Sequence, residues 1–134
     1  MHTFKIMIAT AALLSGFAVA TPAQQREREF HEHERGFSEH VRGVVDRTQD
    51  DLRKAAEFER HKGKEVTRYE NAQKHLSDFD REMTKGHFDK DKLDTAIDDV
   101  KNVVEHNTLD SDARDALRRD LGDLRVVRAE HDQS

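Results

Sequence analysis

The chain contains no cysteine and no tryptophan, and it has one proline among 134 residues. Without cysteine there is no disulfide, thiolate zinc site, iron–sulfur cluster or cysteine nucleophile. One proline and six glycines are too few for the many turns of an all-β chain. Beyond residue 20, no apolar run approaches the length needed to cross a bilayer. These absences leave a helical or partly disordered protein. The length of 134 residues predicts one domain.

Charged residues are abundant instead. They make up 38% of the chain, with 23 basic and 28 acidic residues and a net charge of −5, against about a quarter in an average protein. The acidic balance argues against nucleic acid as a ligand. Arginines do gather in residues 114–128, but aspartates alternate with them, which is typical of a solvated helix face.

Residues 1–20 have the composition of a secretory signal peptide. Lys5 precedes the apolar and small residues Ile6–Ala20, and Ala18-Val19-Ala20 matches the small-x-small cleavage pattern. We predict cleavage after Ala20, with cleavage after Ala23 as the alternative, and hence export to the periplasm or the exterior. An uncleaved membrane anchor is the other interpretation, although the run is shorter than the roughly 20 residues of a spanning helix. Once the signal is removed, we expect no transmembrane segment.

Residues 21–36 form a second region, which is almost wholly polar. Phe30 is its only large apolar residue, and neither the helical nor the strand period gives the segment a face to bury. We therefore predict a charged, flexible arm, either disordered or a frayed helix.

The arm contains the one candidate metal site. In an extended chain His31 and His33 share a side and could chelate zinc, nickel or copper with help from Glu32 and Glu34. The pattern is not that of an HExxH zinc protease, because Arg35 stands where the second histidine is needed. The alternative interpretation is a solvated charged arm that binds no metal.

From Phe37 onwards, apolar residues recur every three or four positions, which predicts amphipathic helices. Gly63 is expected to end the first helix; the alternative is one long first helix and three helices in all. Short connections make consecutive helices antiparallel neighbours. We therefore predict an all-α fold, a small antiparallel up-and-down bundle of residues 37–129 with a thin core, followed by a frayed tail at 130–134. The four predicted helices are 37–61, 64–85, 90–106 and 111–129.

Several residues predict where these helices begin and end. Asp89 is the expected N-cap of the third helix, with Phe88 and Leu93 as a hydrophobic staple around it. Asn107 is the expected left-handed residue at the end of that helix. The helix from residue 111 is capped by Asp110 or Ser111, and Gly86 is expected to stop the second helix.

No motif predicts catalysis or a cofactor. The chain has no GxSxG motif, no glycine-rich phosphate loop and no dinucleotide fingerprint. Asp89-x-Asp91 begins like a calcium loop, but Asp94 and Val100 occupy the positions that require glycine and glutamate. We therefore expect neither an enzyme nor a cofactor.

The leading functional prediction is a non-enzymatic, exported helical interaction or structural protein with an unidentified protein partner or self-association, as in a coiled coil. Adjacent valines at 44/45, 103/104 and 126/127 could place one residue of each pair outside the buried seam; the alternative is that both widen it. The competing hypothesis is a metal-binding or pH-responsive protein. From residue 21 the net charge is −6, and protonation of its eight histidines would move it towards +2.

The C-terminal half contains a series of short patterns. They are Tyr69-Glu-Asn-Ala-Gln-Lys-His-Leu76, Gly86-His-Phe88-Asp89, Leu93-Asp94-x-Ala96-Ile97-x-Asp99-Val100, Val103-Val104-x-x-Asn107-x-Leu109, Arg114-Asp115-x-Leu117 and Asp120-Leu121-x-x-Leu124-Arg125. With these patterns, residues of about 45–128 resemble a group of small exported helical proteins of bacteria that lack an assigned function, which implies a helical fold and export.

Overall fold

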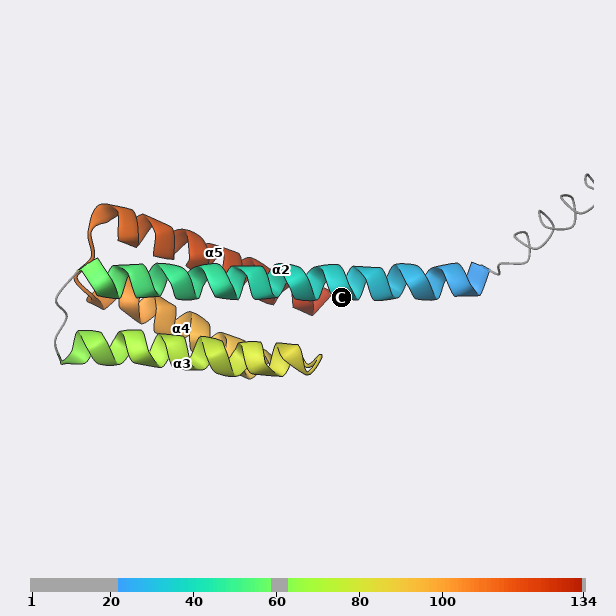
Figure 1. Cartoon of the computed structure of the whole chain (residues 1–134), viewed down its shortest axis with the longest axis horizontal. Coiled ribbons are helices and arrows are strands. Elements are labelled where there is room, and N and C mark those ends of the chain that lie inside the picture. The colour runs from blue at the N-terminus through green and yellow to red at the C-terminus, as the bar shows by residue number, and fades with distance from the viewer. Residues whose placement is uncertain (1–21, 59–62, 134) are drawn as a thin grey trace, which may run out of the picture. The chain divides into compact units, whose positions relative to one another are not determined.

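The computed structural model describes residues 22–58 and 63–133 (Figure 1). The predicted signal peptide therefore lies outside the described residues. The described ranges contain four helices: α2 (Pro22–Phe58), α3 (Lys64–Thr84), α4 (Lys90–His106) and α5 (Ser111–Gln133). No strand occurs in the described ranges. The predicted all-α, four-helix fold is confirmed.

The chain divides into two compact units, Met1–Gly36 and Phe37–Ser134. The second unit is the helical bundle, in which α3 packs against α4 and α4 against α5. Connections of a few residues reverse the chain between these helices, so successive helices run antiparallel (Figure 1).

One hydrophobic core holds the bundle together, and every described helix contributes to it. Its members recur at the three- and four-residue spacing of the sequence, because only that spacing keeps side chains on one face of a helix. Phe79 is the largest side chain buried completely. The buried apolar residues are Val41, Val44, Val45, Leu52, Ala55, Tyr69, Ala72, Leu76, Phe79, Met83, Leu93, Ala96, Ile97, Val100, Val103, Val104, Leu117, Leu121, Leu124 and Val127.

The adjacent valines behave in two ways. Both members of 44/45 and of 103/104 are buried, so these pairs widen the seam. In the third pair Val127 is buried, whereas Val126 is 51% exposed. Only this last pair places a valine outside the core.

Helix α2 begins earlier than predicted. Its start is Pro22 rather than residue 37, and residues 22–36 are helical. Two local features explain the difference. Proline suits the first turn of a helix, and the following segment is rich in glutamine, glutamate and arginine, which favour helix without tertiary packing. Opposite charges such as Arg28 and Glu32 also stand four residues apart. The flexibility of this arm stays a prediction.

The region around Gly63 also differs from the prediction. Gly63 lies at the N-cap position of α3 with φ 59°, rather than closing the first helix, and α2 ends at Phe58. A positive φ suits glycine, which lacks a Cβ. Because α2 and α3 are separate helices, the alternative of three helices is wrong. Gly86, with φ 82°, follows the end of α3 as predicted.

At the start of α4, the Asp89 carboxylate accepts a hydrogen bond from the Lys92 amide at 3.1 Å, so the predicted N-cap is confirmed. For α5 the cap is Asp110, whose Oδ1 accepts from the Ala113 amide at 2.7 Å. The left-handed conformation predicted for Asn107 is wrong: its φ of −86° and ψ of 152° are extended. Side-chain contacts with Glu65 and Arg68 hold this residue instead of a left-handed turn.

Helix α5 continues to Gln133, past the predicted end at residue 129. Several contacts hold the extra turn, including the ion pair of Lys90 with Asp132 at 3.8 Å. Arg128 pairs with Asp132 one turn later, and the ring of His131 stacks on Phe88 with centroids 3.9 Å apart. The tail predicted to fray is therefore helical over residues 130–133. No described helix combines the length and the apolar character that a membrane span requires.

Candidate functional site

The histidine–glutamate cluster of the arm lies on the exposed first part of α2. All described side chains from residue 26 to residue 36 are exposed. Residues two positions apart in a helix do not share a face, so the helix separates His31 from His33. No group of three or more potential metal ligands is present among the described residues. Metal binding by His31, Glu32, His33 and Glu34 stays a prediction, and it would need a local change from the helical backbone.

The most unusual polar residue of the bundle is Asp120, on α5. Its side chain is 1% exposed, which is rare for a carboxylate. The Nε of Arg47, on α2, donates to its Oδ1 at 2.8 Å. The other oxygen, Oδ2, is buried and has no hydrogen-bond donor in the described part of the chain. One half of this carboxylate is therefore satisfied and the other is not.

Two further carboxylates complete this group. Arg47 also binds Asp123, which lies on α5 almost one turn after Asp120. Asp51, one turn after Arg47 on α2, interacts with Asp120 itself. We call Arg47, Asp51, Asp120 and Asp123 the α2–α5 acid cluster. It sets one guanidinium against three carboxyl groups.

The environment changes the proton affinity of this cluster. Burial, and then the neighbouring Asp51, raise the pKa of Asp120 to about 7, although Arg47 acts in the opposite direction. The hydrogen bond to Asp120 raises the pKa of Arg47, which remains a permanent cation. The cluster thus holds a carboxyl group that titrates near neutrality.

Sequence reasoning missed this cluster, although one signal for it exists. Asp120 follows Leu117 by three residues and precedes Leu124 by four, so helical spacing places it on the buried stripe. That spacing could have identified Asp120 as a buried acid. It could not have identified Arg47 and Asp51 as its neighbours, because they are about seventy residues away in the chain.

A second buried polar residue, Asn107, joins α4 to the start of α3. Its Nδ2 donates to the Glu65 carbonyl oxygen at 3.1 Å, and its Oδ1 accepts from Arg68 at 3.1 Å. The Glu65 carboxylate in turn accepts from the Thr108 amide at 2.5 Å. These contacts close one end of the bundle and leave Asn107 only 3% exposed.

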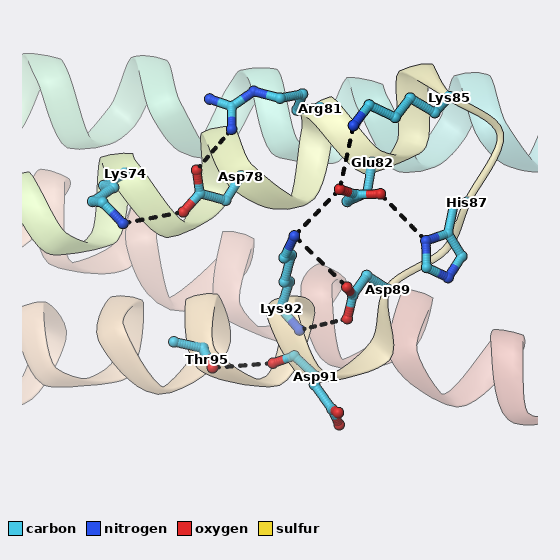
Figure 2. A network of polar contacts seen from close by, with 10 residues as sticks. All are labelled: Lys74, Asp78, Arg81, Glu82, Lys85, His87, Asp89, Asp91, Lys92 and Thr95. Carbon is cyan, nitrogen blue, oxygen red and sulfur yellow. Dashed lines mark hydrogen bonds and ion pairs between the residues drawn. The ribbon is translucent and has the colours of Figure 1, made fainter.

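At the opposite end, Glu82 organises the turn between α3 and α4 (Figure 2). Its carboxylate contacts His87 and Lys92, each at 3.3 Å, and Lys92 also approaches Asp89 at 3.8 Å. The hydrogen bonds from His87 and Lys92 lower the pKa of Glu82.

A second group of ion pairs lies along α3. Asp78 lies between Lys74 and Arg81, and its pKa is lowered chiefly by Lys74. All these groups already have partners, so they serve the fold.

His75 makes a contact between helices that the sequence did not reveal. His75, on α3, binds the Asp99 carboxylate, on α4, and both side chains are partly buried. A histidine–carboxylate pair can orient a proton, but catalysis also needs a reacting group within reach. The pair links α3 to α4.

Three large apolar side chains are exposed in the described residues: Phe30 at 60%, Val126 at 51% and Val66 at 36%. Single exposed valines are ordinary on protein surfaces. Phe30 differs, because it is aromatic and its whole segment is exposed.

Comparison of the chain with family models, with curated proteins and with solved structures gave no match.

Proposed function

We propose that the protein is an exported, non-enzymatic helical interaction protein that binds a protein partner, or a second copy of itself, through residues 26–36 of α2. We call these residues the exposed segment. The observation that carries the proposal is the 60% exposure of Phe30 in a helical segment whose described side chains are all exposed. Burying a phenylalanine side chain is worth about 1.5–3 kcal/mol.

The surroundings of Phe30 also suit an interface. Positions three and four residues away on a helix are its neighbours, and here they are Arg26, Glu27, His33 and Glu34. An aromatic anchor inside a charged rim is the usual composition of a protein–protein contact. The segment buries none of its described side chains, so a partner would supply the burial that it lacks by itself.

Export is the second part of the proposal, and it rests on the sequence of residues 1–20. Its support is the positive start, the apolar run and the Ala18-Val19-Ala20 pattern. N-terminal sequencing of the protein recovered from the exporting cell tests it. A start at Thr21 supports the first cleavage site, a start at Gln24 supports the second, and an intact Met1 in the membrane fraction contradicts cleavage.

The interface is tested by placing a photo-cross-linking amino acid at position 30 and, as the matched control, at position 126. Both side chains are exposed and apolar in the native chain, but Val126 belongs to a well-packed helix. We expect a discrete adduct from position 30 and none from position 126. Sedimentation over a range of concentrations then separates self-association from a different partner.

The same experiment can refute the proposal. A strictly monomeric protein, with no adduct from position 30 in the envelope of the exporting cell, contradicts binding through the exposed segment. Equal adducts from positions 30 and 126 contradict it as well, because they indicate unspecific contact.

A further inference from the structure

The α2–α5 acid cluster carries an inference that is independent of any partner. Asp120 is buried, and its Oδ2 lacks a hydrogen-bond donor among the described residues. An unsatisfied buried oxygen is costly, and more so when it carries charge. The group that interacts with Asp120 beside Arg47 is another carboxyl, that of Asp51. Two ionised carboxylates cannot form a hydrogen bond with each other, but two carboxyl groups that share one proton can.

The charges around Asp120 lead to the same conclusion. Arg47 and Asp51 face it from α2, and Asp123 on α5 shares the Arg47 guanidinium. Neither α3 nor α4 supplies an ion-pair partner to Asp120 within the described ranges. With three carboxylates ionised, the cluster carries a net charge of −2 against a single arginine. One bound proton halves that charge and supplies the missing donor.

We propose that Asp51 and Asp120 hold one proton between them, and that this proton controls the contact between α2 and α5. With the proton bound, the two carboxyls form a hydrogen bond across the helix pair. Without it, they repel each other and only Arg47 joins the two helices at this point. The bundle would then be more stable towards unfolding in mildly acidic solution than in mildly alkaline solution.

The direction of the pH effect follows from proton binding. The pKa of Asp120 is raised to about 7 in the folded protein, whereas an unfolded aspartate titrates near 4. Between these values the folded state holds a proton that the unfolded state has lost. Stability therefore falls as the pH rises through this window, and the unfolding equilibrium constant increases by up to about tenfold per pH unit.

Other carboxylates affect stability at lower pH, and their contribution grows rather than falls as the pH rises. Hydrogen bonds from Lys74, His87 and Arg128 lower the pKa values of Asp78, Glu82 and Asp132, respectively. Their contribution is present above about pH 4 and is lost as the pH falls further. The two effects occupy separate pH ranges, so a maximum of stability is expected between them.

The test is urea unfolding of the full protein at pH 5, 6, 7 and 8, for the wild type, Asp120→Asn and Asp115→Asn. Asp115 is an exposed aspartate of the same helix, so its variant is the matched control. From pH 5 to pH 7, we expect the unfolding constant to rise at least tenfold in the wild type and in D115N. In D120N, whose amide cannot titrate, the rise should be at least fivefold smaller. All three proteins contain the same histidines, so the contributions of these residues cancel in the comparison.

An equal slope in D120N and the wild type overturns the proposal, as does a wild type whose stability is constant or rises between pH 5 and 7. If D120N fails to fold, Asp51→Asn replaces it, because Asp51 is partly exposed and the variant removes one of the two carboxyls that share the proton; its slope should be smaller than that of the wild type. The infrared band of a protonated carboxyl at pH 6 is the direct measurement: it should be present in the wild type and weaker in D51N, where only burial still favours the proton on Asp120, and its absence from the wild type refutes the shared proton.

Discussion

Helix α2 contains two stretches that differ in almost every respect except backbone conformation. In residues 26–36 every described side chain is exposed. In residues 41–55 the helix buries Val41, Val44, Val45, Thr48, Leu52 and Ala55. The cause is the spacing of apolar residues, since Phe30 stands alone whereas the later residues recur every three or four positions. Helix formation and tertiary stability thus have different origins within one element: local preference in the first stretch and burial in the second.

The largest difference between the two stretches is expected when one large side chain is truncated in each. Leu52→Ala should lower the free energy of unfolding by about 2–5 kcal/mol, because Leu52 is fully buried and its loss leaves a cavity. Phe30→Ala should change it by less than about 0.5 kcal/mol. Urea unfolding followed by circular dichroism measures both. A comparable loss in F30A would mean that Phe30 is part of the folded core.

The next largest loss of stability is expected from removing a buried polar side chain. Asn107→Ala removes the amide that donates to the Glu65 carbonyl oxygen and the oxygen that accepts from Arg68. Leaving such partners unsatisfied should cost about 1–3 kcal/mol of unfolding free energy. Glu32→Ala, in the exposed segment, is the control and should stay within about 0.5 kcal/mol of the wild type. If N107A matches E32A, burial does not strengthen polar contacts in this bundle.

A smaller loss of stability is expected from removing a helix cap, which tests whether local hydrogen bonds also stabilise the bundle. Asp89→Ala deletes the cap on the Lys92 amide and should cost about 1 kcal/mol. Asp98→Ala, an exposed mid-helix position of α4, provides the comparison. Thermal unfolding of the two variants should separate their midpoints, with D89A the lower. Identical midpoints would show that packing alone determines the position at which α4 starts.

The smallest expected effect is that of zinc on the exposed segment. Because the helix turns His31 and His33 to different faces, zinc should bind no more tightly to the wild type than to the variant with both histidines replaced by alanine. Calorimetric titration of both proteins measures this. Tighter binding by the wild type, accompanied by loss of helical signal, would show that the arm leaves the helix to bind metal.

The sequence predicted the bundle well because its apolar residues follow one period throughout. The beginning of α4 and the stop at Gly86 followed from single residues whose effect is local. The limits of α2 and α5 did not, for two different reasons. Polar helix formers extended α2 to Pro22 without a buried face, and the stacking of His131 on Phe88 held the last turn of α5.

The number of helices, most of the core and the candidate signal peptide were all predictable from the chain, because each depends on neighbouring residues and on spacing along one element. The meeting of Asp120 with Arg47 and Asp51, and the hold of Asn107 on the start of α3, became visible only in the packed bundle. Those contacts join helices far apart in the chain, so they arise from packing. Their energies depend on burial, because a carboxyl that would titrate near pH 4 in water holds its proton to about pH 7 inside the bundle.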